Sequence, residues 1–223
     1  ELPAYINPWQ QTGTMQHPSG TTGSFTLTPT THGRSDVMKD CRYTADGADY
    51  ALIPRYFYTY ALTNKTLTGP ALPGLSWAYS YGPPNASWSP CGAGCPTAKT
   101  VTVTDPRGDS TLYTFGNAYR VTEGQLQRVD TGWNGSSALS TKTMRYRAPG
   151  AGPYPETAGY GSYTIGDGDA MARHMPMDQQ IITQQGATFR WEATAFDTLV
   201  RPTVVTRASS LGYSRTETTA YSD

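Results

Sequence analysis

The chain has 223 residues with 17 basic and 17 acidic side chains, so its formal net charge is zero. We expect no nucleic-acid binding, because contact with phosphates needs a basic excess or stripe. No stretch approaches the roughly 20 apolar residues of a transmembrane helix, so we expect no membrane insertion. Charged residues make up only 15%, whereas Gly, Pro, Thr, Ser and Tyr are abundant, which favours strands and turns over long helices.

Two parts follow from composition along the chain. Residues 1–36 are rich in Thr, Gly and Pro and form a loop-rich N-terminal segment with one strand candidate at 24–28, whereas residues 37–223 form a β region. Large side chains alternate at residues 56–62 and again at 75–81, which predicts two strands. Residues 63–66 are predicted to be a turn or short connection between them.

A loop at residues 82–98 holds two of the three cysteines. Cys91 and Cys95 flank Gly92-Ala93-Gly94, with a proline on each outer side. We favour a disulfide, which suits a secreted or periplasmic protein, and half of a zinc site is the alternative. The remaining Cys41 is interpreted as a buried free thiol.

The clearest hairpin joins strands at 99–105 and 110–116 through Asp105-Pro106-Arg107-Gly108-Asp109. Proline presets φ, glycine permits a left-handed conformation, and Asp105 is expected to accept bonds from nearby backbone N–H groups. The further expected elements are two short strands around Gly124, strands at 139–147, 180–207 and 213–221, a long loop at 148–168, and one helical turn at 169–174. About 12 to 14 short strands predict an all-β fold of stacked antiparallel hairpins.

Specific residues carry a family resemblance. Asp105-Pro106-Arg107-Gly108, then Tyr113-Thr114-Phe115 and Gly124-Gln125-Leu126, resemble the Rhs or YD-repeat pattern of bacterial proteins. A second copy has Phe196-Asp197 in the Tyr-Asp position, followed by Arg201-Pro202-Thr203. The match is degenerate, because Gly116 replaces the expected Asp after Phe115 and Gln125 stands where Arg is usual. Since the chain stops at Asp223 partway through a unit, we expect a piece of a longer protein.

The resemblance implies a β-sheet ribbon that forms part of a large shell, which in relatives encloses a C-terminal toxin or effector. Each hairpin cannot bury its aromatic face alone, so neighbouring hairpins stack. The expected partners are the rest of the parent repeat chain and an enclosed effector, at a secreted or bacterial cell-surface location. The leading hypothesis is therefore a non-enzymatic structural segment, with no catalytic residue, cofactor or metal.

Two other hypotheses stay open. Aromatic side chains in turns or loops, namely Trp88, Trp133 and Tyr160, are candidates for stacking on a cell-surface glycan, whereas Trp77 and Trp191 are interpreted as core. A carboxylate hydrolase would need Asp167, Asp169 and Glu192 to converge in the fold. Asp167-Gly168-Asp169 also resembles the opening of a calcium loop, but the ligand pattern of an EF-hand does not follow it.

Overall fold

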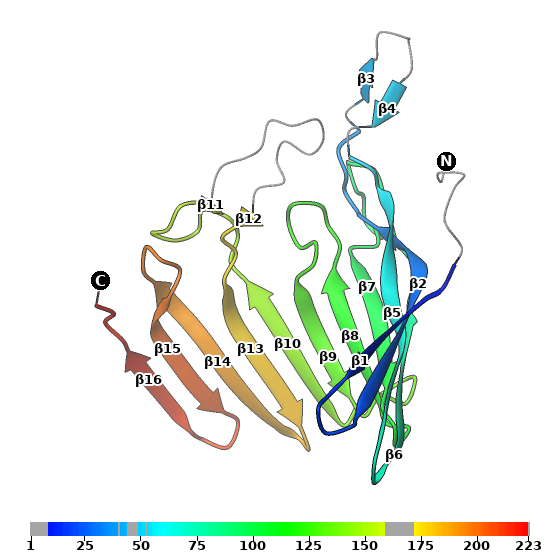
Figure 1. Cartoon of the computed structure of the whole chain (residues 1–223). Helices are drawn as coiled ribbons and strands as arrows, with labels where there is room; N and C mark the ends of the chain where they lie inside the picture. Colours follow the sequence, from blue (N-terminus) through cyan, green and yellow to red (C-terminus); the bar gives the residue numbers. More distant parts are fainter. Residues whose placement is uncertain (1–8, 40, 44–48, 52, 159–171, 223) are drawn as a thin grey trace. The chain divides into compact units, whose positions relative to one another are not determined.

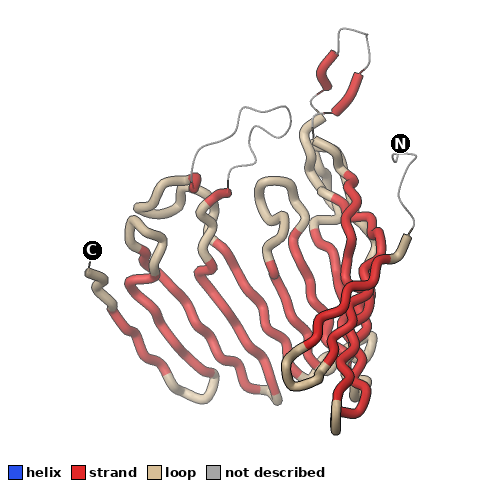
Figure 2. The backbone as a smooth tube through the Cα atoms, in the orientation of Figure 1, coloured by secondary structure: helices blue, strands red, loops and turns tan. Residues whose placement is uncertain are grey.

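The structure is a computed structural model that describes residues 9–39, 41–43, 49–51, 53–158 and 172–222. Within these residues the chain is all-β and contains no helix (Figures 1 and 2). Twelve strands follow one another in the hydrogen-bonded order β1-β2-β5-β6-β7-β8-β9-β10-β13-β14-β15-β16. The predicted fold class of stacked antiparallel hairpins is confirmed, because strands adjacent in this order are also adjacent along the chain, apart from two short excursions.

The strand bounds are as follows: β1 Gln11–Gln16, β2 Thr22–Gly33, β3 Cys41–Tyr43, β4 Asp49–Ala51, β5 Tyr56–Gly69, β6 Leu72–Tyr81, β7 Ala98–Thr104, β8 Ser110–Gly116, β9 Leu126–Thr131, β10 Ser140–Tyr146, β11 Thr157–Ala158, β12 Ala172–Arg173, β13 Met177–Gln184, β14 Ala187–Phe196, β15 Pro202–Ser209 and β16 Ser214–Thr218. The excursions are the two-stranded sheets β3-β4 and β11-β12.

The chain divides into two compact units. The first comprises Glu1–Leu126 and Thr131–Ser137, and the second comprises Gln127–Asp130 and Ala138–Asp223. The compositional boundary at residue 36 lies inside the first unit, where β1 and β2 already occupy Gln11–Gln16 and Thr22–Gly33.

The alternation predicted at residues 75–81 is present in β6. Leu75, Trp77, Tyr79 and Tyr81 are half-buried, and the residues between them are exposed. The turn predicted at 63–66 is wrong, because β5 runs through it from Tyr56 to Gly69. Neighbouring strands override the local turn signals, since Asn64 pairs with β2 on one side and with β6 on the other. Between the pairs Thr26–Asn64 and Leu27–Leu62 the register shifts by one residue, so Thr63 of β5 is the extra residue of a bulge.

Two other local predictions are wrong. Of the two short strands expected around Gly124, the one before it is a turn, in which the N–H groups of Thr122 and Glu123 both donate to the carbonyl of Ala118. Only the second half of that segment forms a strand, β9. The helical turn expected at 169–174 is also wrong where it is described, because Ala172–Arg173 pair with Thr157–Ala158 as β12 and β11. Local turn bonds decide the first outcome, whereas strand pairing overrides local propensity in the second.

Full burial is confined to small cores. In the second unit, Tyr154, Ala193 and Phe196 form a buried cluster, and Trp191 packs against it. The rings of Tyr154 and Phe196 meet edge to face, with centroids 6.1 Å apart. In the first unit, Val37 and Asn117 are completely buried where the connections between strands meet. Most strand residues are only half-buried, so the hydrogen-bonded ladder between neighbours is the main source of order.

One carboxylate is buried within the second unit. The side chain of Asp130 is 2% exposed and accepts two bonds from the Arg128 guanidinium, at 2.7 and 2.9 Å, and one from the Thr141 hydroxyl, at 2.6 Å. The bonds from Arg128, aided by the bond from Thr141, outweigh desolvation and hold the pKa of Asp130 below its usual range. Asp130 therefore favours the folded state while it is ionised.

We predict that Asp130→Asn lowers the free energy of unfolding by about 1–3 kcal/mol at pH 7, because the amide cannot accept the same set of bonds. The pKa of Asp130 is depressed on folding, so its contribution is present above the unfolded pKa of about 3.9 and disappears as pH falls through the lower folded value. Urea unfolding measured from pH 7 to pH 2 checks both points. The exposed Asp109→Asn is the control, expected within about 0.5 kcal/mol of the parent; equal losses for both variants would contradict this account.

Candidate functional site

The repeat motif forms a compact turn between β7 and β8. The N–H of Asp105 donates to the carbonyl of Asp109 at 2.9 Å, and the N–H of Gly108 donates to the carbonyl of Asp105 at 3.0 Å. One carboxylate oxygen of Asp105 accepts from the N–H groups of Arg107 and Asp109, at 2.8 and 3.0 Å. The predicted role of Asp105 as a backbone acceptor is confirmed. Pro106 lies at the exposed second position of this turn.

The same turn joins β14 to β15. The N–H of Asp197 donates to the carbonyl of Arg201 at 3.0 Å, and the N–H of Val200 donates to that of Asp197 at 3.2 Å. One carboxylate oxygen of Asp197 accepts from the N–H groups of Leu199 and Arg201, at 2.9 and 2.8 Å. The other accepts from the Arg201 guanidinium at 2.6 Å. Asp197 is therefore the structural counterpart of Asp105, and Arg201 closes the turn.

Two more hairpins of the described residues use this turn. His17 and Ser209 occupy its first position, and their N–H groups donate to the carbonyls of Thr21 and Tyr213, both at 2.8 Å. Their side chains take the place of the carboxylate: His17 Nδ1 accepts from the N–H of Ser19, and Ser209 Oγ accepts from the N–H two residues on. Among the described residues, each compact unit thus contains two copies of one five-residue turn, which we call the repeat turn.

The fourth position of the repeat turn is left-handed in every copy. Gly20, Gly108 and Gly212 have φ values of 83°, 89° and 89°, and Val200 has a φ of 67°. Glycine adopts this region without steric cost, whereas an L residue with a Cβ pays about 1–2 kcal/mol. A β-branched residue there is an outlier, so Val200 is a strained copy of the glycine position.

Electrostatics favours the ionised turn carboxylates. Desolvation raises the pKa of Asp105, but the backbone N–H groups and the Arg107 guanidinium outweigh it and leave the pKa below its ordinary value. At Asp197, bonds from Arg201 and from the N–H of Leu199 outweigh desolvation in the same way, so its pKa is also lowered. Both carboxylates accept bonds that hold the backbone, so they act as structural acceptors.

The aromatic members of the motif differ in position. Tyr113 lies in β8 after the repeat turn that begins at Asp105, is half-buried and pairs with Val101. Phe196 ends β14 immediately before the repeat turn that begins at Asp197, is 7% exposed and belongs to the buried cluster with Tyr154. The guanidinium of Arg147 lies 4.9 Å from the centre of the Phe196 ring. The two sequence copies therefore align at their turns and not at their aromatic residues.

The tryptophans predicted to face a glycan belong to different connections. Trp88 lies between β6 and β7, is half-buried, forms a bridge with Val37 and has the Arg55 guanidinium 5.2 Å from its ring. Trp133 follows β9, is half-buried, and its backbone N–H donates to Ser110 at 2.8 Å. Tyr160 lies outside the described residues.

Cys91 and Cys95 are joined as the sequence predicts, with Cα atoms 5.6 Å apart. Their loop is held by the N–H of Cys91, which donates to Asp36 Oδ1 at 3.1 Å. The side chain of Cys41 lies outside the described part of the structure, so its interpretation as a buried free thiol stays a prediction.

The carboxylates named for a hydrolase are only partly described, because Asp167 and Asp169 lie outside the described residues. Glu192 takes part in an ion-pair network with Arg145 and Arg190, both at 3.4 Å, and accepts from Gln179 at 3.2 Å. Within the described ranges, no group of three or more His, Cys, Asp and Glu side chains is placed to hold a metal ion. The same ranges contain no helix long and apolar enough to cross a membrane.

Sequence analysis missed a cationic cluster in the first unit. His32 stacks on Phe57 with centroids 5.4 Å apart, and Lys99 Nζ lies 5.9 Å from the centre of the same ring. Desolvation lowers the pKa of His32, and the charge of Lys99 adds to this. Desolvation also lowers the pKa of Lys99; Glu123 opposes the shift, and Arg34 reinforces it. Burial thus disfavours the charged form of both groups.

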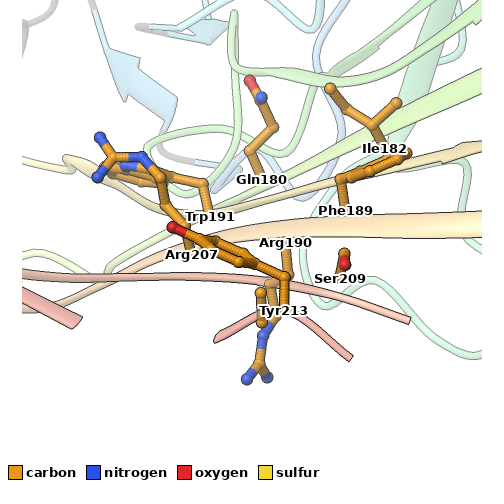
Figure 3. A pocket seen from close by; sticks show the side chains of 9 residues that line it. Gln180, Ile182, Phe189, Arg190, Trp191, Arg207, Ser209 and Tyr213 are labelled. Carbon is orange, nitrogen blue, oxygen red and sulfur yellow. The ribbon is translucent and has the colours of Figure 1, made fainter. Parts of the chain in front are cut away.

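A groove in the second unit was also missed. Its volume is about 380 Å³, and the rings of Phe189, Trp191 and Tyr213 form its apolar part (Figure 3). Gln180 and Arg207 contribute polar groups. The residues come from β13, β14, β15 and the turn after β15, so no contiguous motif marks the site. We call it the aromatic groove.

No family model, curated protein or solved structure matches this chain. The geometry of the chain itself therefore carries the functional argument.

We predict that Gly108→Ala lowers the free energy of unfolding by about 1–2 kcal/mol, because alanine in the left-handed region is strained. A Cβ at Gly108 would meet nothing within 4 Å, so the cost is conformational. Gly13→Ala in β1 is the matched control, since a Cβ there also meets nothing within 4 Å and φ is not positive. We expect no loss at Gly13, as judged by thermal and urea unfolding. Similar effects at both positions would refute the role given to the repeat turn.

Proposed function

We propose that the chain is a non-enzymatic structural segment of a large secreted or surface Rhs/YD-repeat protein. In this proposal its hairpins form part of the wall of a β-sheet shell that encloses a C-terminal effector. The rest of the parent repeat chain is the main partner, and no residue here has a catalytic role. The Cys91–Cys95 disulfide is consistent with an oxidising, extracytoplasmic location.

The observation that carries the proposal is the recurrence of the repeat turn. Four hairpin connections use the same backbone bonds and the same left-handed fourth position, although their sequences differ. The Asp197 and Arg201 side chains give a physical reason for an Asp followed four residues later by an Arg, because the pair closes the turn. A turn that recurs in four hairpins supports a repetitive architecture over an assembled active site.

Shallow burial supports the same function. The strands are mostly half-buried, and full burial is limited to a few residues such as Val37, Ala193 and Phe196. A hairpin with so little core depends on the strands beside it for its backbone bonds. Stability shared between neighbours is what a wall of stacked hairpins requires.

The two edge strands indicate where a wall would continue. Every residue of β1, Gln11–Gln16, is exposed, and the strand contains no charge, proline or known bulge to block another strand. At the other edge, β16 carries Arg215 and Glu217. An exposed uncharged edge such as β1 favours pairing with further strands, whereas charged side chains such as those of β16 oppose it. In the proposal, strands of the parent repeat chain cover these edges.

We predict that the isolated chain self-associates through β1, because nothing on that strand prevents edge-to-edge pairing. Met15→Lys should raise the dissociation constant at least about tenfold, equivalent to about 1.4 kcal/mol, when measured by sedimentation. Leu139→Lys is the control, because Leu139 is 79% exposed and lies outside both edge strands. A chain that stays monomeric at all concentrations, or that responds equally to both lysines, would argue against an open wall segment.

A further inference from the structure

The aromatic groove lies on one face of the second unit, where the strand register brings its parts together. Trp191 in β14 stands opposite Gln180 in β13 and Arg207 in β15. Phe189, two residues earlier on the same face, stands opposite Ile182 and Ser209. Figure 3 shows the rings of Phe189, Trp191 and Tyr213 around the groove, with the Arg190 side chain directed away from them.

Packing holds the ring of Trp191, and a backbone bond holds the main chain at Tyr213. Trp191 packs against the buried cluster of Tyr154, Ala193 and Phe196. Tyr213 ends a repeat turn, in which its carbonyl accepts the N–H of Ser209 at 2.8 Å. Phe189 and Tyr213 nevertheless remain 44% and 54% exposed. The two exposed rings are open to a ligand, and aromatic side chains have few rotatable bonds, so the cost of ordering them on binding is small.

The charged groups beside the groove are paired, although Arg207 and Arg215 share the single carboxylate of Glu217 and the three groups together carry one net positive charge. Arg207 pairs with Glu217, and Arg215 lies 3.3 Å from the same carboxylate. On the opposite face, Arg190 pairs with Glu192 at 3.4 Å. An arginine paired with a carboxylate presents hydrogen-bond donors and acceptors side by side, which suits hydroxyl groups. A cluster of unpaired arginines would instead select an anion. Because both arginines already bond to a carboxylate, the groove favours a neutral ligand with hydroxyl groups over a strongly charged anion.

The backbone at the groove is already occupied. β14 pairs with β13 on one side and with β15 on the other. A peptide that binds over these strands cannot add to the sheet as a further strand. It therefore cannot form the backbone hydrogen bonds that give strand addition its affinity. Recognition has to come from ring faces and side-chain polar groups. The volume of about 380 Å³ lies within the range of small-ligand pockets.

We propose that the aromatic groove binds a neutral oligosaccharide. The apolar C–H face of a pyranose ring stacks on Trp191 and Tyr213, and its hydroxyl groups bond with Gln180 and the Arg207–Glu217 pair. Phe189 provides an apolar contact for the neighbouring sugar unit. This binding role goes beyond the scaffold role and does not depend on it, because a wall segment without glycan affinity and a glycan-binding domain outside a shell are both physically coherent.

The test begins with the whole chain on an array of neutral and acidic glycans, followed by calorimetry with the best neutral hexasaccharide. We expect a dissociation constant below about 1 mM. Tyr213→Ala should weaken binding at least about tenfold, because it removes a stacking ring while its backbone bond remains. Trp9→Ala is the matched control: Trp9 is 70% exposed and lies in the first unit, so binding should not change.

Several results would overturn the inference. These are no binding to any neutral glycan, unchanged affinity in Tyr213→Ala, equal loss in Trp9→Ala, or binding only to acidic glycans that disappears with added salt. Self-association that Tyr213→Ala abolishes, without glycan binding, would assign the groove to protein contact instead. Phe189→Ala provides a second test, because Phe189 is exposed and lies outside the buried cluster. Circular dichroism and thermal unfolding of each variant separate lost binding from lost folding.

Discussion

The bond between a side-chain acceptor and the backbone N–H two residues later is the interaction on which four of the described hairpins depend. At Asp105 and Asp197 the same oxygen also accepts a second N–H, four residues along, which closes the turn across its mouth. A closed turn fixes how the two strands pair, and pairing decides which side chains share a face. Through the strand register, the carboxylates of Asp105 and Asp197 therefore help to determine which side chains lie together on a sheet face. The stacked hairpins and the aromatic groove both depend on that arrangement.

A sheet with sparse full burial places unusual weight on its backbone ladder. Val37 and Asn117 in the first unit, and Ala193 and Phe196 in the second, are exceptions in a chain of half-buried residues. Such strands gain most of their stability from neighbours on both sides, so the outermost strands are the weak points. The same construction frees side chains for other roles, and the groove of Phe189, Trp191 and Tyr213 occupies a face that the ladder holds rigid.

Patterns that act locally were predictable from the sequence. The alternation around Trp77 and the acceptor role of Asp105 depend on residues a few positions apart. The continuity of β5 through Thr63–Thr66 was not predictable, because Asn64 is held by β2 and β6 together. The repeat turns at His17 and Ser209 were not predictable either, because an imidazole nitrogen and a hydroxyl replace the carboxylate.

The aromatic groove could not be predicted for a further reason. Gln180, Trp191 and Arg207 meet only because three strands pair in one register, and Tyr213 joins them through a turn that had not been recognised. Trp191 was interpreted as a core residue, and that holds for the part of its ring against the buried cluster. Its other contacts line the groove, so one side chain serves both packing and a surface.

The central claim is that the strands of this chain form part of a longer sheet in the parent protein. Amide hydrogen exchange tests this claim most directly. Exchange at β1 and β16 would be measured in the isolated chain and in the intact parent protein. The account predicts fast exchange at these edge strands in isolation and strong protection in the parent, where neighbouring strands complete the ladder. Equal, fast exchange in both would contradict it, because the edges would then be free and the chain a self-contained sheet.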